Sequence, residues 1–231
     1  RPGEVAGQLF DSARQNKLSR AYTGGSTRSQ AHALANDVIL IVTGKKGVGN
    51  TQIVFKVGTG DQSEIYVSDF DGFGATKVTS DHSLVTAPAW MPGQRKLFYT
   101  SYKNGCPNIL THDLDNGERT VFAKYPGNNF SPAVSPDGSK VAMILNKNGI
   151  SPDLYVCNID GTGLRQLTST KEEESSPCWS PASRTICVSS SLGGTPALYT
   201  SPAAGGTPRL FQSPGPTSPP APGRPPGGQP Q

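Results

Sequence analysis

Short apolar runs alternate with polar turns along most of this chain. Runs rich in Val, Ile, Leu, Tyr and Phe occupy residues 53–57, 97–100, 141–145 and 186–189, with Asp, Gly, Pro, Asn and Ser residues between them. Runs of this length and composition, bounded by turn-forming residues, are typical of β-strands joined by tight turns. The pattern therefore predicts a chain built mainly of short strands.

The strand pattern repeats at a nearly constant interval. A proline-containing box occurs at residues 87–93, 131–138 and 176–183. Its first proline recurs at Pro88, Pro132 and Pro177, at intervals of 44 and 45 residues. A second pattern, typified by Ile-Tyr-Val-Ser-Asp-Phe-Asp-Gly, recurs at residues 65–72, 109–117, 154–161 and, in degraded form, 198–206. A fixed period of roughly 40–50 residues indicates stacked supersecondary units.

Each repeat predicts four strands. In the second unit we expect them at roughly residues 88–91, 95–102, 108–113 and 118–123. Four antiparallel strands in a unit of this length form one blade of a β-propeller. A β-sandwich also contains many short strands, but it gives no reason for so strict a repeat. We therefore expect an all-β fold, a β-propeller of four-stranded antiparallel blades, with about four blades in an incomplete ring.

One helix precedes the blades. Residues 28–43 carry apolar side chains at helical spacing, which predicts a buried stripe of Ala31, Leu34, Val38, Ile41 and Val42. Thr27 with Gln30 resembles a capping box, and Gly44 is expected to end the helix. Residues 1–26 show little periodicity.

The patterns divide the chain into three parts. Residues 1–47 end in the helix, residues 48–211 hold the blades, and residues 212–231 are dominated by Pro and Gly. The last stretch cannot bury enough apolar surface to offset the entropy of ordering it, so we expect it to be disordered.

Charge and apolar content exclude two classes of partner. The formal net charge is +4, and the Lys and Arg residues form no basic stripe of the kind that nucleic acid requires. The longest apolar run, residues 38–42, is far shorter than the roughly 18 residues of a membrane span. We expect neither nucleic-acid binding nor direct membrane insertion.

The four cysteines lack the spacing of a metal site. Cys178 and Cys187 are nine residues apart across a predicted turn, so they could face each other on neighbouring strands. Two interpretations stay open. The pair could form a disulfide, whose geometry is demanding, or both could be small buried apolar residues.

Motifs of enzymes are missing. The segment of residues 44–51 superficially resembles a phosphate-binding loop, but Asn50 stands where lysine is required, and the segment joins a helix to a strand. The sequence contains no G-x-S-x-G nucleophile elbow, and the recurring Asp residues belong to turns. We expect no enzyme activity, no cofactor and no metal.

The junction between helix and blades resembles a known family. Residues 35–47 followed by Thr-Gln-Ile-Val-Phe at 51–55, and the segment Glu-Ile-Tyr-Val-Ser-Asp-Phe-Asp-Gly at 64–72, are similar to the TolB family. TolB is the periplasmic β-propeller of the bacterial Tol–Pal envelope system. The resemblance covers roughly residues 26–210 and identifies the chain as a fragment truncated at both ends.

The resemblance implies a non-catalytic scaffold. TolB proteins have an N-terminal α/β domain, of which residues 1–47 would be the end, and a six-bladed propeller. They act in the periplasm in envelope integrity, cell division and import, so a signal peptide would lie in the missing N-terminal part. The propeller binds the peptidoglycan-associated lipoprotein Pal, and the N-terminal region engages the inner-membrane Tol components.

The resemblance also indicates where a partner would bind. In the family, loops just before each box surround the propeller mouth and contact Pal. The matching residues here are Asn128 and Ser131 in one loop and Ser175 in the next, and the neighbouring cluster of Asn128, Asn129 and Phe130 could also dock a partner. Asn128 replaces a family histidine. Loops on a rigid scaffold commonly carry recognition.

Two other functions fit a propeller. The first is the gating propeller of a serine peptidase of the prolyl oligopeptidase class, and the second is a generic extracellular binding propeller. A flanking hydrolase domain with a G-x-S-x-G elbow would distinguish the peptidase.

Overall fold

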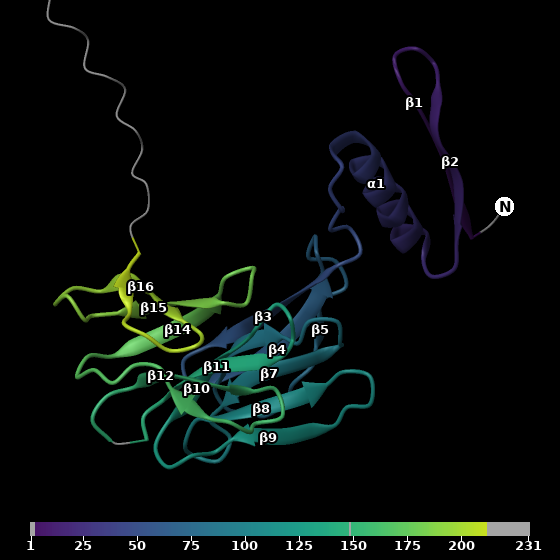
Figure 1. Ribbon diagram of the computed structural model, residues 1–231. Helices are drawn as coiled ribbons and strands as arrows, with labels where there is room; N and C mark the ends of the chain where they lie inside the picture. The colour runs from purple at the N-terminus through teal and green to yellow at the C-terminus, as the bar shows by residue number, and fades with distance from the viewer. Residues whose placement is uncertain (1–2, 148, 212–231) are drawn as a thin grey trace, which may run out of the picture.

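A computed structural model describes residues 3–147 and 149–211, and it arranges most of them in four fan-like sheets (Figure 1). The first sheet contains β3 (Gln52–Thr59), β4 (Gln62–Asp69) and β5 (Thr76–Lys77). The second contains β6 (Val85–Trp90), β7 (Lys96–Ser101), β8 (Asn108–Asp113) and β9 (Arg119–Ala123). The third contains β10 (Asn129–Val134), β11 (Lys140–Leu145), β12 (Asp153–Asn158) and β13 (Arg165–Gln166). The fourth contains β14 (Glu174–Trp179), β15 (Thr185–Ser190), β16 (Ala197–Pro202) and β17 (Arg209–Leu210).

Each sheet is one blade, and consecutive strands pair antiparallel in chain order. The predicted propeller blades are therefore confirmed. The inner strand of the second blade starts at Val85, a few residues before the predicted position. The proline boxes form these inner strands and the turns that follow them.

Apolar residues join the blades face to face. One core cluster lies between the first and second blades and includes Ile65 and Tyr99. The next lies between the second and third blades and includes Phe98 and Met143, and the last joins the third blade to the fourth around Ile144. Burial of apolar surface between neighbouring sheets is what holds a propeller together.

The burial pattern of a blade's second strand shows whether one or both faces of that blade are covered by a neighbouring blade. In β11 the residues from Val141 to Leu145 are all fully buried, because alternate side chains enter the clusters on either side. In β15 only Ile186, Val188 and Ser190 are buried, and the residues between them are half-exposed. The continuous apolar run thus marks a blade with two neighbours, and the alternating run marks one with a single covered face.

The inner strands share a backbone irregularity. The residue before the first proline of each box, Ala87, Ser131 or Ser176, has a positive φ of 49° to 54°. The pairing register shifts at the same points in β6, β10 and β14. Each box therefore contains a β-bulge, which bends the strand as it enters the blade.

The first blade has three strands among the described residues, and β3 occupies the place of a second strand. The two tryptophans of the boxes reflect this difference. Trp179 donates its indole N–H to the carbonyl of Ala133 on the inner strand of the preceding blade, at 2.9 Å. The indole N–H of Trp90 is buried and has no acceptor in the described part of the chain.

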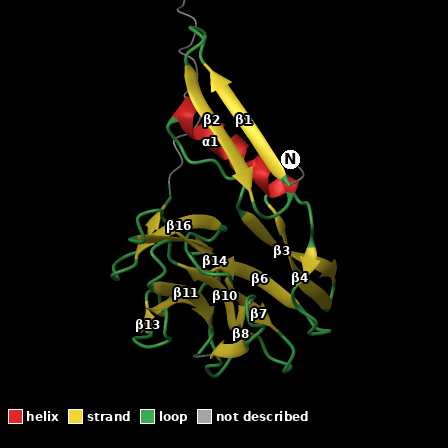
Figure 2. Ribbon diagram, turned by 90° about the vertical axis from the view of Figure 1, so that its right-hand side faces the viewer, coloured by secondary structure: helices red, strands yellow, loops and turns green. Residues whose placement is uncertain are grey.

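A hairpin and one helix precede the blades. Strands β1 (Glu4–Phe10) and β2 (Asn16–Thr23) pair antiparallel, and α1 (Thr27–Thr43) packs against them (Figure 2). No periodic pattern in residues 1–26 predicts this hairpin. No helix among the described residues has the length and apolar content needed to cross a membrane.

The helix ends differ partly from expectation. Gly44 closes the helix in the left-handed conformation, as predicted, and donates its N–H to the carbonyl of Leu40. The predicted capping box at Thr27 and Gln30 is wrong. The N-cap is Ser26, whose hydroxyl accepts from the N–H of Ser29, and Gln30 is buried with its amide bonded to the carbonyls of two glycines.

The predicted buried stripe on the helix is also wrong. Leu34 and Val38 are half-buried, whereas Ala31 is exposed and Ile41 and Val42 are 41% and 70% exposed. The two-stranded hairpin is too narrow to cover the whole apolar side of a helix of this length. The expected disorder of residues 212–231 concerns residues outside the described part of the chain.

Candidate interaction surface

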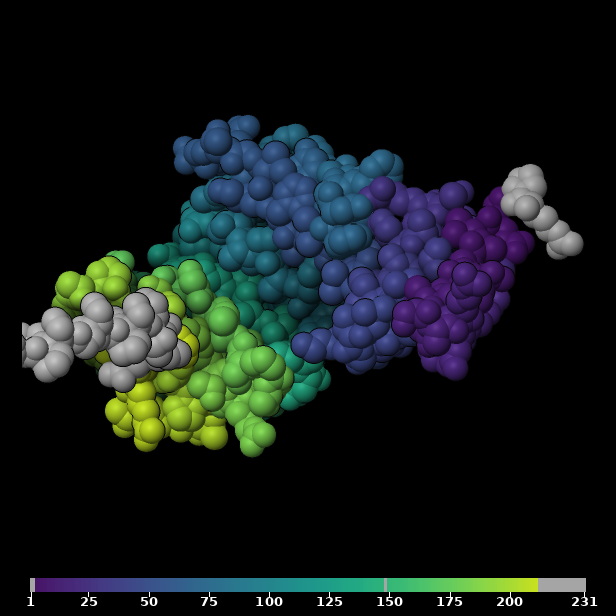
Figure 3. Space-filling model, turned by 90° about the horizontal axis from the view of Figure 1, so that it is seen from above, coloured from purple at the N-terminus to yellow at the C-terminus, as the bar shows by residue number. Residues whose placement is uncertain are grey.

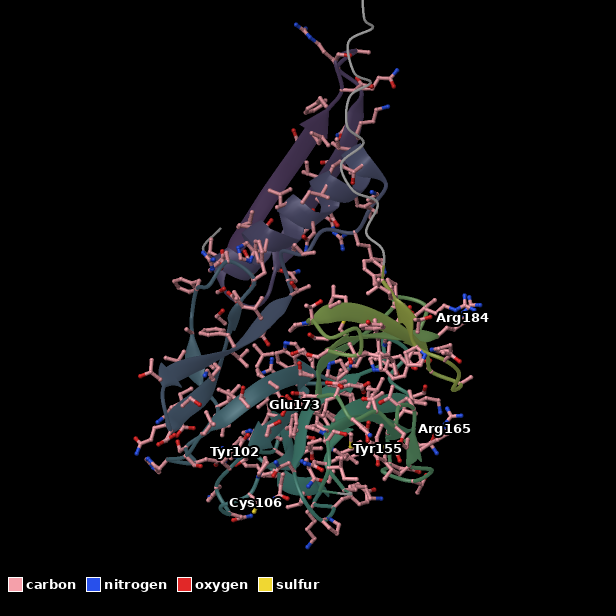
Figure 4. The ribbon with its side chains drawn as sticks, turned by 90° about the vertical axis from the view of Figure 1, so that its left-hand side faces the viewer. Tyr102, Cys106, Tyr155, Arg165, Glu173 and Arg184 are labelled. Carbon is pink, nitrogen blue, oxygen red and sulfur yellow. The ribbon has the colours of Figure 1, made fainter. Side chains whose placement is uncertain are left out.

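The strand order places two sets of loops at opposite ends of the blades. The linker from α1 enters β3 at one end, where the loops that follow first and third strands also lie. The loops that precede inner strands lie at the other end, together with those that follow second strands. We call this second set the distal face, and it comprises residues 60–61, 78–84, 102–107, 124–128, 146–147, 149–152, 167–173 and 191–196. Tyr102 and Cys106 lie there, far from the hairpin (Figure 4).

One buried amide fastens the central loop of this face. Asn129 is fully buried, and its side chain accepts the N–H of Tyr125 at 2.8 Å. The same side chain donates to the carbonyls of Tyr125 at 2.8 Å and Gly127 at 3.1 Å. Gly127 has a φ of 80°, and a Cβ there would lie 1.9 Å from the carbonyl oxygen of Asn146. Loop 124–128 is thus closed onto the first residue of its own strand.

The other residues implied by the family resemblance take different positions. Asn128 is exposed, and its carbonyl accepts the N–H of Asn146 at 2.9 Å. Phe130 packs against the cluster between the third and fourth blades. Ser131 is half-buried and donates its N–H to the hydroxyl of Thr100. Ser175 is exposed at the start of β14. Asn128 and Ser175 can therefore meet a partner, whereas the side chain of Asn129 is fully used within the loop.

The same face carries a cationic and aromatic group that the sequence does not predict. The ammonium of the exposed Lys147 lies 4.9 Å from the ring centroid of Tyr125 and 5.8 Å from that of Tyr155. Burial raises the pKa of both phenols. The three residues come from different loops and strands, so no local sequence signal marks them. They place a positive charge beside Asn128 at the surface, since residues 146 and 128 are hydrogen-bonded.

Two carboxylates, one half-buried and one buried, fasten the loop between the first and second blades. Glu64 accepts the N–H groups of Asp81 and His82 at 3.2 and 3.1 Å and the hydroxyl of Thr79. Burial acts to raise the pKa of Glu64, but these hydrogen bonds outweigh it and lower the pKa. Asp81 itself is buried and pairs with Arg119 of the second blade at 2.8 Å. The loop between the first and second blades is held from both sides.

Two buried acids at the starts of β12 and β14 hold the loop between the third and fourth blades. Glu174 accepts the N–H of Leu154 at 2.9 Å and the hydroxyl of Thr168. Asp153 accepts the N–H of Thr170 and the amide of Gln166, each at 3.0 Å. Burial raises the pKa of both carboxyls, and the hydrogen bonds offset only part of the effect.

Glu174 gives the protein a specific dependence on pH. Its pKa in the folded protein lies above the ordinary value of 4.5. The stability that its carboxyl contributes is therefore complete below that pH and is lost as the pH rises through the folded pKa. At about pH 4, where the carboxyl is protonated, we expect Glu174→Gln and the wild type to unfold at the same denaturant concentration. Toward pH 7, where the wild type must bury a charged carboxylate, we expect the variant to unfold at a higher denaturant concentration.

The matched control is Glu173→Gln, which changes the exposed neighbouring residue. Its denaturation midpoint should follow that of the wild type at every pH. Identical pH profiles for the two variants would contradict the raised pKa of Glu174.

The opposite end holds a cleft between the N-terminal unit, residues 3–44, and the first two blades. Its volume is about 1050 Å³, and Tyr22, His32 and Trp90 are among its lining residues. Arg28 of α1 pairs with Asp69, one of the lining residues, at 3.6 Å, and it also pairs with Asp71. Figure 3 shows this unit against the first blade, away from the fourth.

Neither end assembles a metal centre within residues 3–147 and 149–211, because no three His, Cys, Asp or Glu residues gather there in a way that could hold an ion. The exposed groups of the distal face include the amide of Asn128, the ammonium of Lys147 beside two aromatic rings, and the charged side chains of Lys103, Glu172 and Glu173. Such groups suit recognition of another surface.

Comparisons with known proteins match this architecture. The sequence model of a family described as the TolB beta propeller domain matches residues 40–219. The Tol-Pal system protein TolB of Anaeromyxobacter sp. (strain K) is 31% identical over 157 residues, which cover 68% of this chain and 36% of that protein. The chain thus spans little more than a third of the relative's length.

Solved structures share the fold. TolB from Acinetobacter baumannii superposes with a TM-score of 0.79 at 24% identity, over 92% of this chain and 55% of that one. A puromycin-hydrolysing peptidase of Mycobacterium tuberculosis superposes with a TM-score of 0.54 at 16% identity, over 69% of this chain and 29% of that one. The boxes, the blades that they build and the family match over most of the chain confirm the resemblance drawn from the sequence. This chain belongs to the TolB β-propeller family.

Proposed function

We propose that this chain is a non-catalytic scaffold of the bacterial envelope that binds a Pal lipoprotein through its distal face. The main observation in support is that the loops of the distal face are held in place by hydrogen bonds from polar side chains. Loops from three blade junctions are each held by a polar side chain: the half-buried Glu64, the buried Asn129 and the buried Glu174. Pre-ordered loops lose little entropy when a partner binds.

The proposal assigns the two ends of the blades to different partners. The distal face would contact Pal in the periplasm, and the N-terminal unit at the opposite end would face the inner-membrane Tol components. The relatives named TolB support this assignment over the gating propeller of a peptidase. Asn128 and Lys147 are the exposed groups best placed to form the centre of the contact.

Titration calorimetry with the lipid-free domain of Pal from the parent bacterium tests the proposal. We expect binding by the whole chain, and about tenfold weaker binding by the double variant Asn128→Ala and Lys147→Ala, because both changes remove exposed polar contacts. Neither side chain is buried, so the variant should melt like the wild type.

The matched control is Arg184→Ala, which removes a charged side chain from a turn at the other end of the fourth blade (Figure 4). Its affinity should equal that of the wild type. The absence of binding by the folded wild type at low salt would overturn the proposal, and so would equal losses in the distal variant and the control.

A further inference from the structure

Two free thiols lie directly opposite each other in the fourth blade. Cys178 on β14 and Cys187 on β15 are partners in the antiparallel register, next to the pair Trp179 and Ile186. Directly opposed residues project from the same face of a sheet. The two sulfur atoms therefore share one face.

That face points away from the third blade. Ile186 and Val188 point into the cluster between the third and fourth blades, so alternation turns Cys187 to the other side. Cys178 is exposed and Cys187 is half-buried, which corrects the sequence-based alternative that both are buried apolar residues. Among the described residues, no other sheet covers this side of the fourth blade.

The backbone geometry suits a covalent bond between them. Opposed residues in an antiparallel pair have Cα atoms about 4.5–5.5 Å apart, and a disulfide spans roughly 4.4–6.8 Å. The pKa of the Cys187 thiol is raised by burial and also by the charge of Cys178, which places the two groups within electrostatic reach.

The other two cysteines differ from this pair. Cys157 is buried, and burial raises the pKa of its thiol to about 12. Cys106 is exposed in loop 102–107, and none of the other three cysteines is its partner in the strand register. Cys178 and Cys187 are thus the one cysteine pair that the register brings together.

We propose that Cys178 and Cys187 form a redox-active pair that a small-molecule disulfide, such as oxidised glutathione, converts to a cross-strand disulfide. The thiolate of the more exposed Cys178 attacks one sulfur of the oxidant, forms a mixed disulfide and releases one glutathione thiolate. The thiolate of Cys187 then attacks the Cys178 sulfur and releases the second. Two protein thiols lose two protons and two electrons, and one glutathione disulfide becomes two thiols.

The disulfide would tie β14, the inner strand of the fourth blade, to β15. Cys178 follows the bulge at Ser176, where β14 bends into the sheet. A bond to β15 would fix this strand in register directly below Ser175 and the distal loop. Oxidation would therefore stiffen the entrance to the fourth blade without altering its outline.

Peptide mapping tests the proposal on the whole chain carrying Cys106→Ser, which removes the exposed unpaired thiol. Trypsin cleaves after Lys171, Arg184 and Arg209, so the two cysteines fall in separate peptides. After incubation with oxidised glutathione we expect one species that joins peptides 172–184 and 185–209, lighter than their sum by two hydrogen masses. Cys157 should stay reduced, and dithiothreitol should release both peptides.

The additional variant Cys178→Ser separates the pair from a merely accessible thiol. It should yield only a slow glutathione adduct on Cys187, since its partner is gone. Stable glutathione adducts on Cys178 without the joined species, in protein that melts like the reduced wild type, would overturn the proposal. Joined peptides that also contain Cys157 would overturn it as well, because they indicate oxidation of unfolded chain.

Discussion

Replacing Asn129 by alanine is expected to lower the free energy of unfolding by about 3 kcal/mol. The amide makes three hydrogen bonds to the backbone of its own loop, and each contributes about 0.5–1.5 kcal/mol. Its loss leaves the N–H of Tyr125 without that acceptor beside a fully buried position. Urea denaturation followed by tryptophan fluorescence measures the effect.

The adjacent substitution Asn128→Ala is the control. Its side chain is exposed, and the hydrogen bond to Asn146 comes from its backbone carbonyl, which alanine keeps. We expect a change within about 0.5 kcal/mol. If the two variants unfold at the same urea concentration, Asn129 does not fasten the loop.

Ile144→Ala is expected to cost about 3 kcal/mol and to weaken the junction of the third and fourth blades. Ile144 is fully buried in the cluster that joins these blades. Truncation of a buried isoleucine removes apolar contacts and leaves a cavity, with typical costs of about 2–5 kcal/mol. Differential scanning calorimetry should show a lower melting temperature.

Ile150→Ala provides the comparison, because that isoleucine is 74% exposed in a distal loop. It should melt within about a degree of the wild type. Equal melting temperatures for the two isoleucine variants would show that the junction between the third and fourth blades does not limit stability.

The repeat made the blades predictable. Every blade repeats the same order of strands and turns, so its apolar residues recur at the same places along the chain. The sequence predicts the second strand of the third blade at residues 141–145, and the structure places it at Lys140–Leu145. The inner strands were placed less well, since the bulge before each box proline breaks the alternation.

The N-terminal hairpin was not predictable in the same way. Its strands contain polar and small residues, and they are held by contact with the helix. Leu34 lies so close to Gly7 that a Cβ there would be 2.3 Å from the leucine side chain. That fit depends on the tertiary arrangement, and no periodicity within residues 4–23 expresses it.

The candidate site was predictable in position but not in the role of each side chain. The period located the loops before the boxes, and with them Asn128 and Ser175. Sequence alone could not show that Asn129 turns inward to bind Tyr125, because its partners are backbone atoms. The sequence alone also could not show that the ammonium of Lys147 lies close to the rings of Tyr125 and Tyr155.

Because Asn129 closes loop 124–128 from within, the distal face can change in evolution without a change in the blades. The amide holds backbone atoms of its own loop, and it makes no side-chain bond to another blade. Substitutions at the exposed tip can therefore accumulate without disturbing the sheets beneath. A new binding specificity can arise one loop at a time, while the ring that carries the loops stays the same.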